Sequence, residues 1–240
     1  AQRRLHVRGD AGHGSIPLGR VSAVEMLAQV SRVLSQAQWP QASDEIWAGF
    51  VRAFEFDSEL EESLISGTYR GDYSEFGDLA AYAHAVSHMT VAQTVVRAGG
   101  PINVLPSSGE LELDIRTLPG QSDDDVDRAI TEALGELTEH VTIERLLSER
   151  ATASSIDTKL YRAIEETLTQ ANPGAKIVPI LFPGGSDLRV GRHKGGVGYG
   201  FGSCSSGATL GQVYSQLHAH DEHIAVEDVV STVCALDHLT

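Results

Sequence analysis

The pattern of apolar and polar positions predicts four strands in the first part of the chain. Leu5 to Arg8 and Glu110 to Thr117 alternate with the period of a half-buried strand. Met89 to Ala98 and Val141 to Leu147 are rich in β-branched and other apolar residues, which also favours strands. The turn Gly99-Gly100-Pro101 separates two of these segments.

Apolar residues at helical spacing predict two helices between these strands. Ser22 to Glu25 has the spacing of a capping box, and apolar residues then recur with a helical period to about residue 36. Ser122, followed by three aspartates, is typical of the start of a second helix, which runs through Leu137. The order strand, helix, strand, strand, helix, strand predicts a ferredoxin-like α+β domain, in which a four-stranded antiparallel sheet carries two helices on one face.

The pattern divides the chain into two domains. The first spans residues 1–150 and includes a stretch of mixed signals over 39–85, which we interpret as an insertion of uncertain structure. The polar stretch Glu149 to Asp157 marks the boundary, and residues 151–240 alternate helices and strands in the manner of part of an α/β domain. The elements expected there are a helix over 158–171, strands over 176–181 and 196–201, and a helix over 226–239.

Composition and charge exclude several classes of protein. The 240 residues carry 18 Lys and Arg against 33 Asp and Glu, so the formal net charge of -15 argues against a nucleic-acid partner. No apolar run approaches the about 20 residues needed to cross a bilayer, so we expect no membrane partner. Two cysteines do not make a disulfide framework, which favours a reducing, cytoplasmic location. The chain begins in strand-like sequence without Met, which we interpret as a sign of a fragment.

The segment His218-Ala219-His220-Asp221-Glu222-His223 is the first candidate site. Its three imidazoles and two carboxylates are types of group that bind zinc, although a solvated surface loop would have the same composition. The pattern H-x-H-x-D-H of metallo-β-lactamase-type hydrolases is a poor match. That fold needs further ligands downstream, and only 17 residues follow His223.

Three further segments carry candidate chemistry. His13 lies in Gly12-His13-Gly14-Ser15, where flanking glycines let other backbone approach the ring, although it could equally be bonded to its own loop. Asn103 and Arg116 follow a turn and could bind a carbonyl and a carboxylate, or belong to a plain hairpin. Gly184-Gly185-Ser186-Asp187 follows a predicted strand, at the end where ligands bind in α/β sheets.

Taken in order, these segments resemble motifs of the two-domain, co-catalytic zinc metallopeptidases and deacylases. That family includes acetylornithine deacetylase, succinyl-diaminopimelate desuccinylase, aminoacylase, carnosinase and glutamate carboxypeptidase. The resemblance rests on Gly12 to Ser15 with Pro17 (G-H-x-S-x-P), Gly99 to Pro106 (G-G-x-x-N-V-I-P), Asp114 to Gly120 (D-x-R-x-x-P-G), Gly184 to Asp187 (G-G-T-D) and His218 to Glu222 (H-x-x-D/N-E).

The resemblance implies a role for each candidate residue. His13 is similar to a lid histidine that reaches the partner subunit's site and polarises the scissile carbonyl, with His88 ranked below it. Asn103 and Arg116 would hold the substrate's carbonyl and carboxylate, and His218 would be a zinc ligand. The residues that would line the substrate pocket are Gly185, Ser186 and Asp187.

The resemblance also implies what the chain lacks. The family's H-x-D pair, bridging Asp and Glu-Glu pair have no match here, so we expect a lid or dimerisation domain over 1–150 and the C-terminal part of a catalytic domain over 151–240. The intact enzyme would be a homodimer with two zinc ions per site, cobalt or manganese being alternatives. It would hydrolyse an amide bond in a small dipeptide or N-acyl amino acid, and this chain alone would be inactive. Two alternatives stay open: a non-catalytic dimerisation module, and a metal-binding protein that uses His218 to His223.

Overall fold

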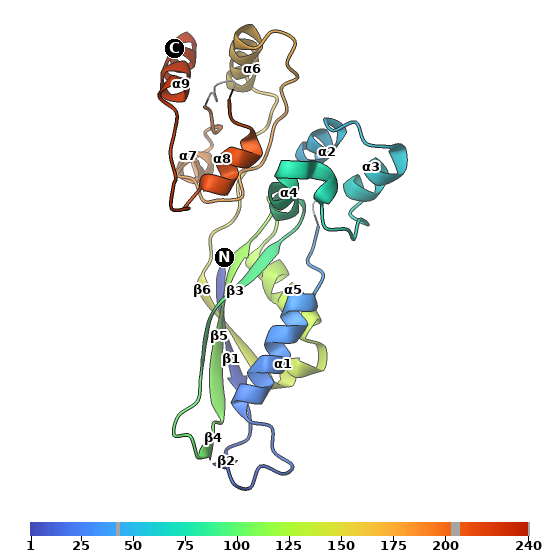
Figure 1. Ribbon diagram of the computed structural model, residues 1–240, viewed down its shortest axis with the longest axis vertical. Coiled ribbons are helices and arrows are strands. Elements are labelled where there is room, and N and C mark those ends of the chain that lie inside the picture. The colour runs from blue at the N-terminus through green and yellow to red at the C-terminus, as the bar shows by residue number, and fades with distance from the viewer. Residues whose placement is uncertain (42–43, 203–206, 240) are drawn as a thin grey trace. The chain divides into compact units, whose positions relative to one another are not determined.

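The computed structural model describes residues 1–41, 44–202 and 207–239 (Figure 1). The chain forms two compact units, each built from two separate segments. The sheet unit comprises Ala1–Gln41 and His88–Ala151, and the helical unit comprises Ala42–Ser87 and Thr152–Thr240. The segment interpreted as an insertion in the first domain therefore packs with the residues that follow the sheet unit, and the proposed domain division stays a prediction.

The sheet unit contains the predicted four-stranded sheet. All neighbouring strands are antiparallel, in the order β3-β5-β1-β6, so the first and last strands of the chain segment pair with each other. Leu5 in β1 lies opposite Leu111 in β5 and Ile143 in β6. The strands are β1 (Gln2–Arg8), β3 (Thr90–Ala98), β5 (Ser108–Arg116) and β6 (Val141–Leu147).

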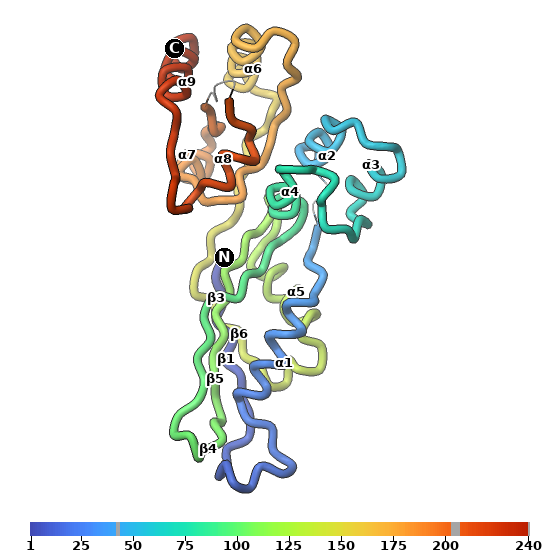
Figure 2. Tube along the Cα trace, viewed as in Figure 1, coloured from blue at the N-terminus to red at the C-terminus, as the bar shows by residue number. Residues whose placement is uncertain are grey.

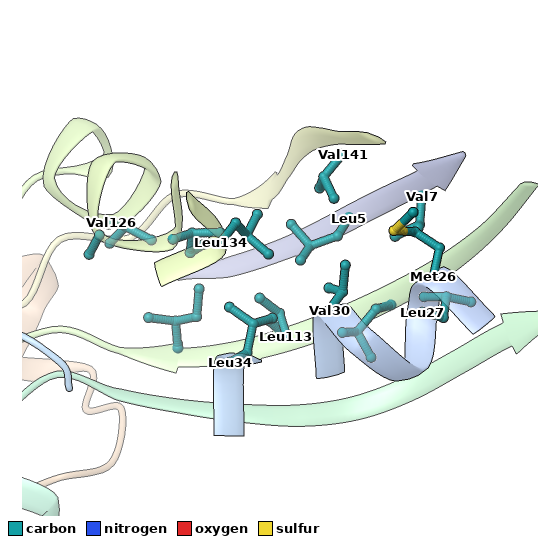
Figure 3. Packing of buried hydrophobic residues seen from close by; sticks show 14 of the residues in the cluster. Leu5, Val7, Met26, Leu27, Val30, Leu34, Leu113, Val126, Leu134 and Val141 are labelled. Carbon is teal, nitrogen blue, oxygen red and sulfur yellow. The ribbon is translucent and has the colours of Figure 1, made fainter. Parts of the chain in front are cut away.

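Two helices cover one face of this sheet, α1 (Ala23–Gln36) and α5 (Asp123–Leu134), which confirms the predicted ferredoxin-like arrangement. Ser122 caps α5 in a reciprocal capping box with Asp125, and hydrogen bonds from Ser122 lower the pKa of Asp125 to about 2. In the strands, apolar side chains at every second position face the helices. In the helices, apolar side chains at every third or fourth position face the sheet, and the two sets pack together in one core (Figure 3). The core includes Leu5, Val7, Met26, Leu27, Val30, Leu34, Leu113, Val126, Leu134 and Val141.

Short elements complete the sheet unit. β2 (Gly12–His13) and β4 (Val104–Leu105) form a separate two-stranded ladder, and η2 (Gly135–His140) joins α5 to β6. The loops that carry β2 and β4 lie side by side at one end of the main sheet, as the tube in Figure 2 makes visible.

The helical unit is held together by aromatic side chains. Tyr82 donates a hydrogen bond to the carbonyl of Leu181 at 2.8 Å and stacks on Tyr214, with ring centroids 5.1 Å apart. Trp47, Phe50 and Phe76 form a buried cluster beside it. The helices are α2 (Glu45–Arg52), α3 (Ser58–Ile65), η1 (Ser74–Leu79), α4 (Ala80–Ser87), α6 (Lys159–Ala171), α7 (Leu188–His193), α8 (Leu210–Gln216) and α9 (Val226–His238).

Two strand predictions are wrong. Residues 176–181 and 196–201 have no regular secondary structure and no strand pairing, and the described part of the helical unit contains no strand. A strand is stable only where its N–H and C=O groups meet a neighbouring ladder. Neither segment has such a neighbour among the described residues, so apolar composition alone does not make them strands. No helix in the described ranges is long and apolar enough to cross a bilayer.

Candidate functional site

The loop that carries His13 is closed at its base. The N–H of Asp10 donates to the carbonyl of Val21 at 2.7 Å, and the N–H of Val21 donates to the Asp10 carboxylate at 2.9 Å. The Arg20 guanidinium donates to the carbonyl of Ala11 across the loop. These contacts hold the exposed loop in one conformation although it buries little surface.

The structure brings His13 and Asn103 together. In the β2–β4 ladder His13 lies opposite Val104, and the N–H of Gly14 donates to the carbonyl of Asn103 at 2.7 Å. A Cβ added at Gly14 would lie 3.2 Å from that same oxygen, which explains why glycine suits this position. The side chains of His13 and Asn103 are both exposed, and the ladder places them at the same end of the sheet unit.

The His13 ring is bonded locally as well. Its Nδ1 accepts a hydrogen bond from the N–H of Ser15 at 3.2 Å and lies 2.8 Å from the Ser15 hydroxyl. Sequence reasoning did not single out Ser15. The signal was its position two residues after His13 in a glycine-rich loop, where a Ser side chain often bonds to a nearby group.

Arg116 lies away from these two residues. It ends β5, whereas the loop that carries Asn103 precedes Ser108 at the start of the same strand. The nine-residue strand places the two ends about 27 Å apart. Arg116 is half-exposed and pairs with Asp114 at 2.8 Å. His88, the second-ranked histidine, pairs through its backbone with Gln41.

Gly185, Ser186 and Asp187 form the exposed turn before α7. The Ser186 hydroxyl accepts a hydrogen bond from the N–H of Leu188 at 3.3 Å, and its carbonyl accepts one from the N–H of Arg189 at 3.2 Å. A Cβ on Gly185 would meet nothing within 4 Å. The turn therefore has open space around it within the helical unit.

His218 begins a tight exposed turn in the helical unit. Its φ of 60° lies in the left-handed region, and its N–H donates to the Glu222 carboxylate at 3.2 Å. Nδ1 of His223 lies 2.6 Å from the carbonyl of Asp221. The predicted ligand His218 and Glu222 are thus close, but through backbone and carboxylate rather than through two side chains aimed at one point.

The described residues do not fit a zinc site by themselves. Within 1–41, 44–202 and 207–239, no three His, Cys, Asp or Glu side chains lie close enough to hold a metal ion. A catalytic zinc takes three protein ligands and a structural zinc takes four. The interpretation of His218 to His223 as a self-sufficient metal site is therefore not supported, because its side chains do not converge.

The sheet unit is thus a two-layer α+β domain with a histidine loop at one end. The sequence model of the peptidase dimerisation domain matches residues 1–142. The chain belongs to the M20 peptidase dimerisation domain family. This confirms the resemblance to the two-domain metallopeptidases.

Known relatives agree with this assignment. The probable carboxypeptidase S-like 2 of Dictyostelium discoideum is 25% identical over 107 residues, which are 44% of this chain and 20% of the relative. An M20 family metallo-carboxypeptidase from Sulfolobus solfataricus has the same fold over 99% of this chain and 56% of its own, with a TM-score of 0.66 and 18% identity. Aminopeptidase PepT from Bacillus cereus matches 99% of this chain and 50% of its own, with a TM-score of 0.56 and 13% identity. The chain spans about half the length of these solved relatives and a fifth of the curated one.

Proposed function

We propose that this chain is part of a zinc-dependent hydrolase that cleaves an amide bond in a small dipeptide or N-acyl amino acid. Residues 1–150 would be its lid and dimerisation domain, and residues 151–240 the C-terminal part of its catalytic domain. The family match and the peptidase relatives support the class of reaction. Because the described residues offer no complete metal site, the chain alone is expected to be inactive. A cytoplasmic location, favoured by the low cysteine content, belongs to the same proposal.

Each candidate side chain has a place in this proposal. His13 donates a hydrogen bond to the oxygen that becomes negative as the amide is attacked. Asn103 donates its amide to the same region, and the Arg116 guanidinium binds the free carboxylate of the substrate. His218 would hold one of the two zinc ions of the intact enzyme, with cobalt or manganese as alternatives. The residues proposed to line the substrate pocket are Gly185, Ser186 and Asp187.

The distance between Arg116 and His13 is the main support for a site that two subunits share. The about 27 Å between the ends of β5 far exceeds the about 7 Å that an extended dipeptide spans. One small substrate cannot touch both residues of a single copy. A site that uses both must take Arg116 from one subunit and His13 from its partner, which is what a dimerisation domain can provide.

The edge of the sheet formed by β3 is the proposed dimer contact. β3 and β6 are the two edge strands, and charged side chains on an edge discourage pairing with another chain. β6 carries Glu144 and Arg145, whereas β3 has no charged residue before Arg97. Val96 on β3 is 66% exposed, as expected for an apolar residue that a second copy covers.

The proposal is tested by His13→Ala in a zinc-loaded enzyme that contains this chain. We expect kcat to fall about 100-fold or more, because one donor to the developing oxyanion is lost. Bound zinc, measured by atomic absorption, should be unchanged because His13 lies in no candidate metal cluster. His140→Ala, which alters an exposed histidine of η2, is the matched control. Unchanged turnover of His13→Ala would remove this residue from the reaction.

A second candidate function, a non-catalytic dimerisation module, is favoured by one observation. No three potential ligands converge anywhere in the described residues. The two functions are separated by zinc titration and light scattering of the purified chain together with hydrolysis assays of the longer enzyme. A stable dimer that gives no hydrolysis in any zinc-loaded form would favour the module.

A further inference from the structure

Two hydrogen-bond donors of Ser15 meet one nitrogen of the His13 ring. The backbone N–H of Ser15 points at Nδ1 over 3.2 Å, and the Ser15 hydroxyl lies 2.8 Å from the same atom. A backbone N–H can only donate, so Nδ1 must accept. The neutral imidazole carries one proton, and that proton is therefore on Nε2.

The turn that follows His13 fixes this contact. The N–H of Ile16 donates to the carbonyl of His13 at 2.9 Å and closes a four-residue turn around Ser15. The bond from Gly14 to the carbonyl of Asn103 holds the same turn against β4. The Ser15 N–H is thus kept in place by backbone hydrogen bonds rather than by its own side chain.

The other ring nitrogen is left available. Among the described residues no hydrogen bond to Nε2 of His13 is found, and the side chain is exposed. An Nε2–H that faces solvent can donate to a ligand without first breaking a bond within the loop. A donor of fixed orientation is the kind of group that stabilises an oxyanion best, because it needs no reorganisation during the reaction.

We propose that Ser15 is a positioning residue that fixes His13 in the Nε2–H tautomer and thereby makes it a hydrogen-bond donor toward the substrate. The use of this donor in amide hydrolysis rests on the proposed function. The tautomer itself depends only on the loop, so it can be measured in this chain without metal or substrate.

Nitrogen-15 NMR of the imidazole rings at a pH where histidines are neutral is the direct test. Ring nitrogen shifts distinguish a protonated from an unprotonated nitrogen. His13 should show Nε2–H alone, whereas His223 should show Nδ1–H, because its Nδ1 faces the carbonyl of Asp221 at 2.6 Å. His140, which is exposed and has no hydrogen bond to its ring among the described residues, is the internal reference for a tautomer mixture.

Variants of Ser15 separate positioning from folding. Ser15→Thr keeps both donors and should retain the His13 signature. Ser15→Ala loses the hydroxyl but keeps the backbone N–H donor, so His13 should stay in the Nε2–H form with only a small shift of Nδ1 toward the His140 value. The loss of one of the two contacts should lower kcat of the zinc-loaded enzyme by less than about tenfold, with KM little changed. A wild-type His13 that shows Nδ1–H, or the same mixture as His140, would overturn the proposal. A correct tautomer combined with full activity of His13→Ala would instead overturn the proposed function and leave the tautomer assignment intact.

Discussion

At the scale of single residues, Gly9 joins the bases of the two loops that carry His13 and Asn103. Its N–H donates to the carbonyl of Ser107 at 3.0 Å, and the N–H of Ala23 donates to that of Pro106 at 2.8 Å beside it. A Cβ on Gly9 would lie 2.2 Å from the backbone nitrogen of Ala23, a distance that no rotation of a side chain can relieve.

Gly9→Ala should therefore destabilise the sheet unit by about 2 kcal/mol or more, as overpacking against fixed backbone does. Urea unfolding followed by circular dichroism measures this difference. Gly100→Ala is the control, because a Cβ there meets nothing within 4 Å. Equal stability of the two variants would contradict the close packing described at Gly9.

The residues of the candidate site show what a sequence can and cannot reveal at this scale. The identities of His13, Asn103 and Arg116 could be proposed from motifs and residue chemistry. The sequence could not reveal that His13 lies beside Asn103 and not beside Arg116. This neighbourhood depends on the β2–β4 ladder, which joins segments far apart in the chain. Ser15 was part of the G-H-x-S-x-P motif, but its role was not predicted, because a local bond to a ring nitrogen leaves no periodic pattern in the sequence.

At the scale of elements, Arg3 joins β1 to the first turns of α5. Its side chain is fully buried, and Nε donates to the Asp127 carboxylate at 2.7 Å. It also bonds to Asp123, and this hydrogen bond holds the pKa of the Asp123 carboxyl below its ordinary value. Both carboxylates are about a quarter exposed, so water shares in their solvation.

Arg3→Ala should lower the free energy of unfolding by about 3 kcal/mol at neutral pH, since it leaves two carboxylates without their buried partner. Because the Asp123 pKa is lowered in the folded state, the stabilisation from this pair is complete above the ordinary carboxyl pKa and is lost as the pH falls below it. Unfolding curves from pH 7 to pH 3 should show the difference from wild type shrinking.

Arg8→Ala is the control for this variant, because Arg8 lies at the exposed end of β1 and its guanidinium donates to the carbonyl of Glu139 and to no carboxylate among the described residues. It should change stability by less than about 1 kcal/mol. A difference for Arg3→Ala that stayed constant to pH 3 would show that lost packing, and not the ion pair, accounts for its effect.

Elements were predictable where their pattern was periodic and their partners lay in the same unit. β1 and β5 alternate, β3 and β6 are rich in residues that favour strands, and α1 and α5 carry both an apolar stripe and an N-cap serine, so local and long-range preferences agree. The strands predicted at 176–181 and 196–201 failed because apolar residues alone do not supply a ladder partner. The stretch 39–85 gave mixed signals because its helices are short and bury aromatic rings on several sides.

At the scale of the whole molecule, the helical unit carries apolar side chains that are exposed among the described residues. The exposed apolar positions on α9 repeat with a helical period, so they form one stripe along the helix. A stripe of this kind is expected where further protein packs against a helix. Its members are Val226, Val229, Val230, Val233 and Leu236.

The dimer with a shared site is tested most directly by mixing two inactive variants of a zinc-loaded enzyme that contains this chain. Neither His13→Ala nor Arg116→Ala alone should hydrolyse dipeptides or N-acetyl amino acids at an appreciable rate. In a mixed dimer, one of the two sites receives His13 from the Arg116→Ala subunit and Arg116 from the His13→Ala subunit. We predict that exchange of subunits restores hydrolysis, up to the activity of one complete site in each mixed dimer. If the mixture stays inactive while light scattering shows that mixed dimers form, His13 and Arg116 do not act across two subunits and the account is contradicted.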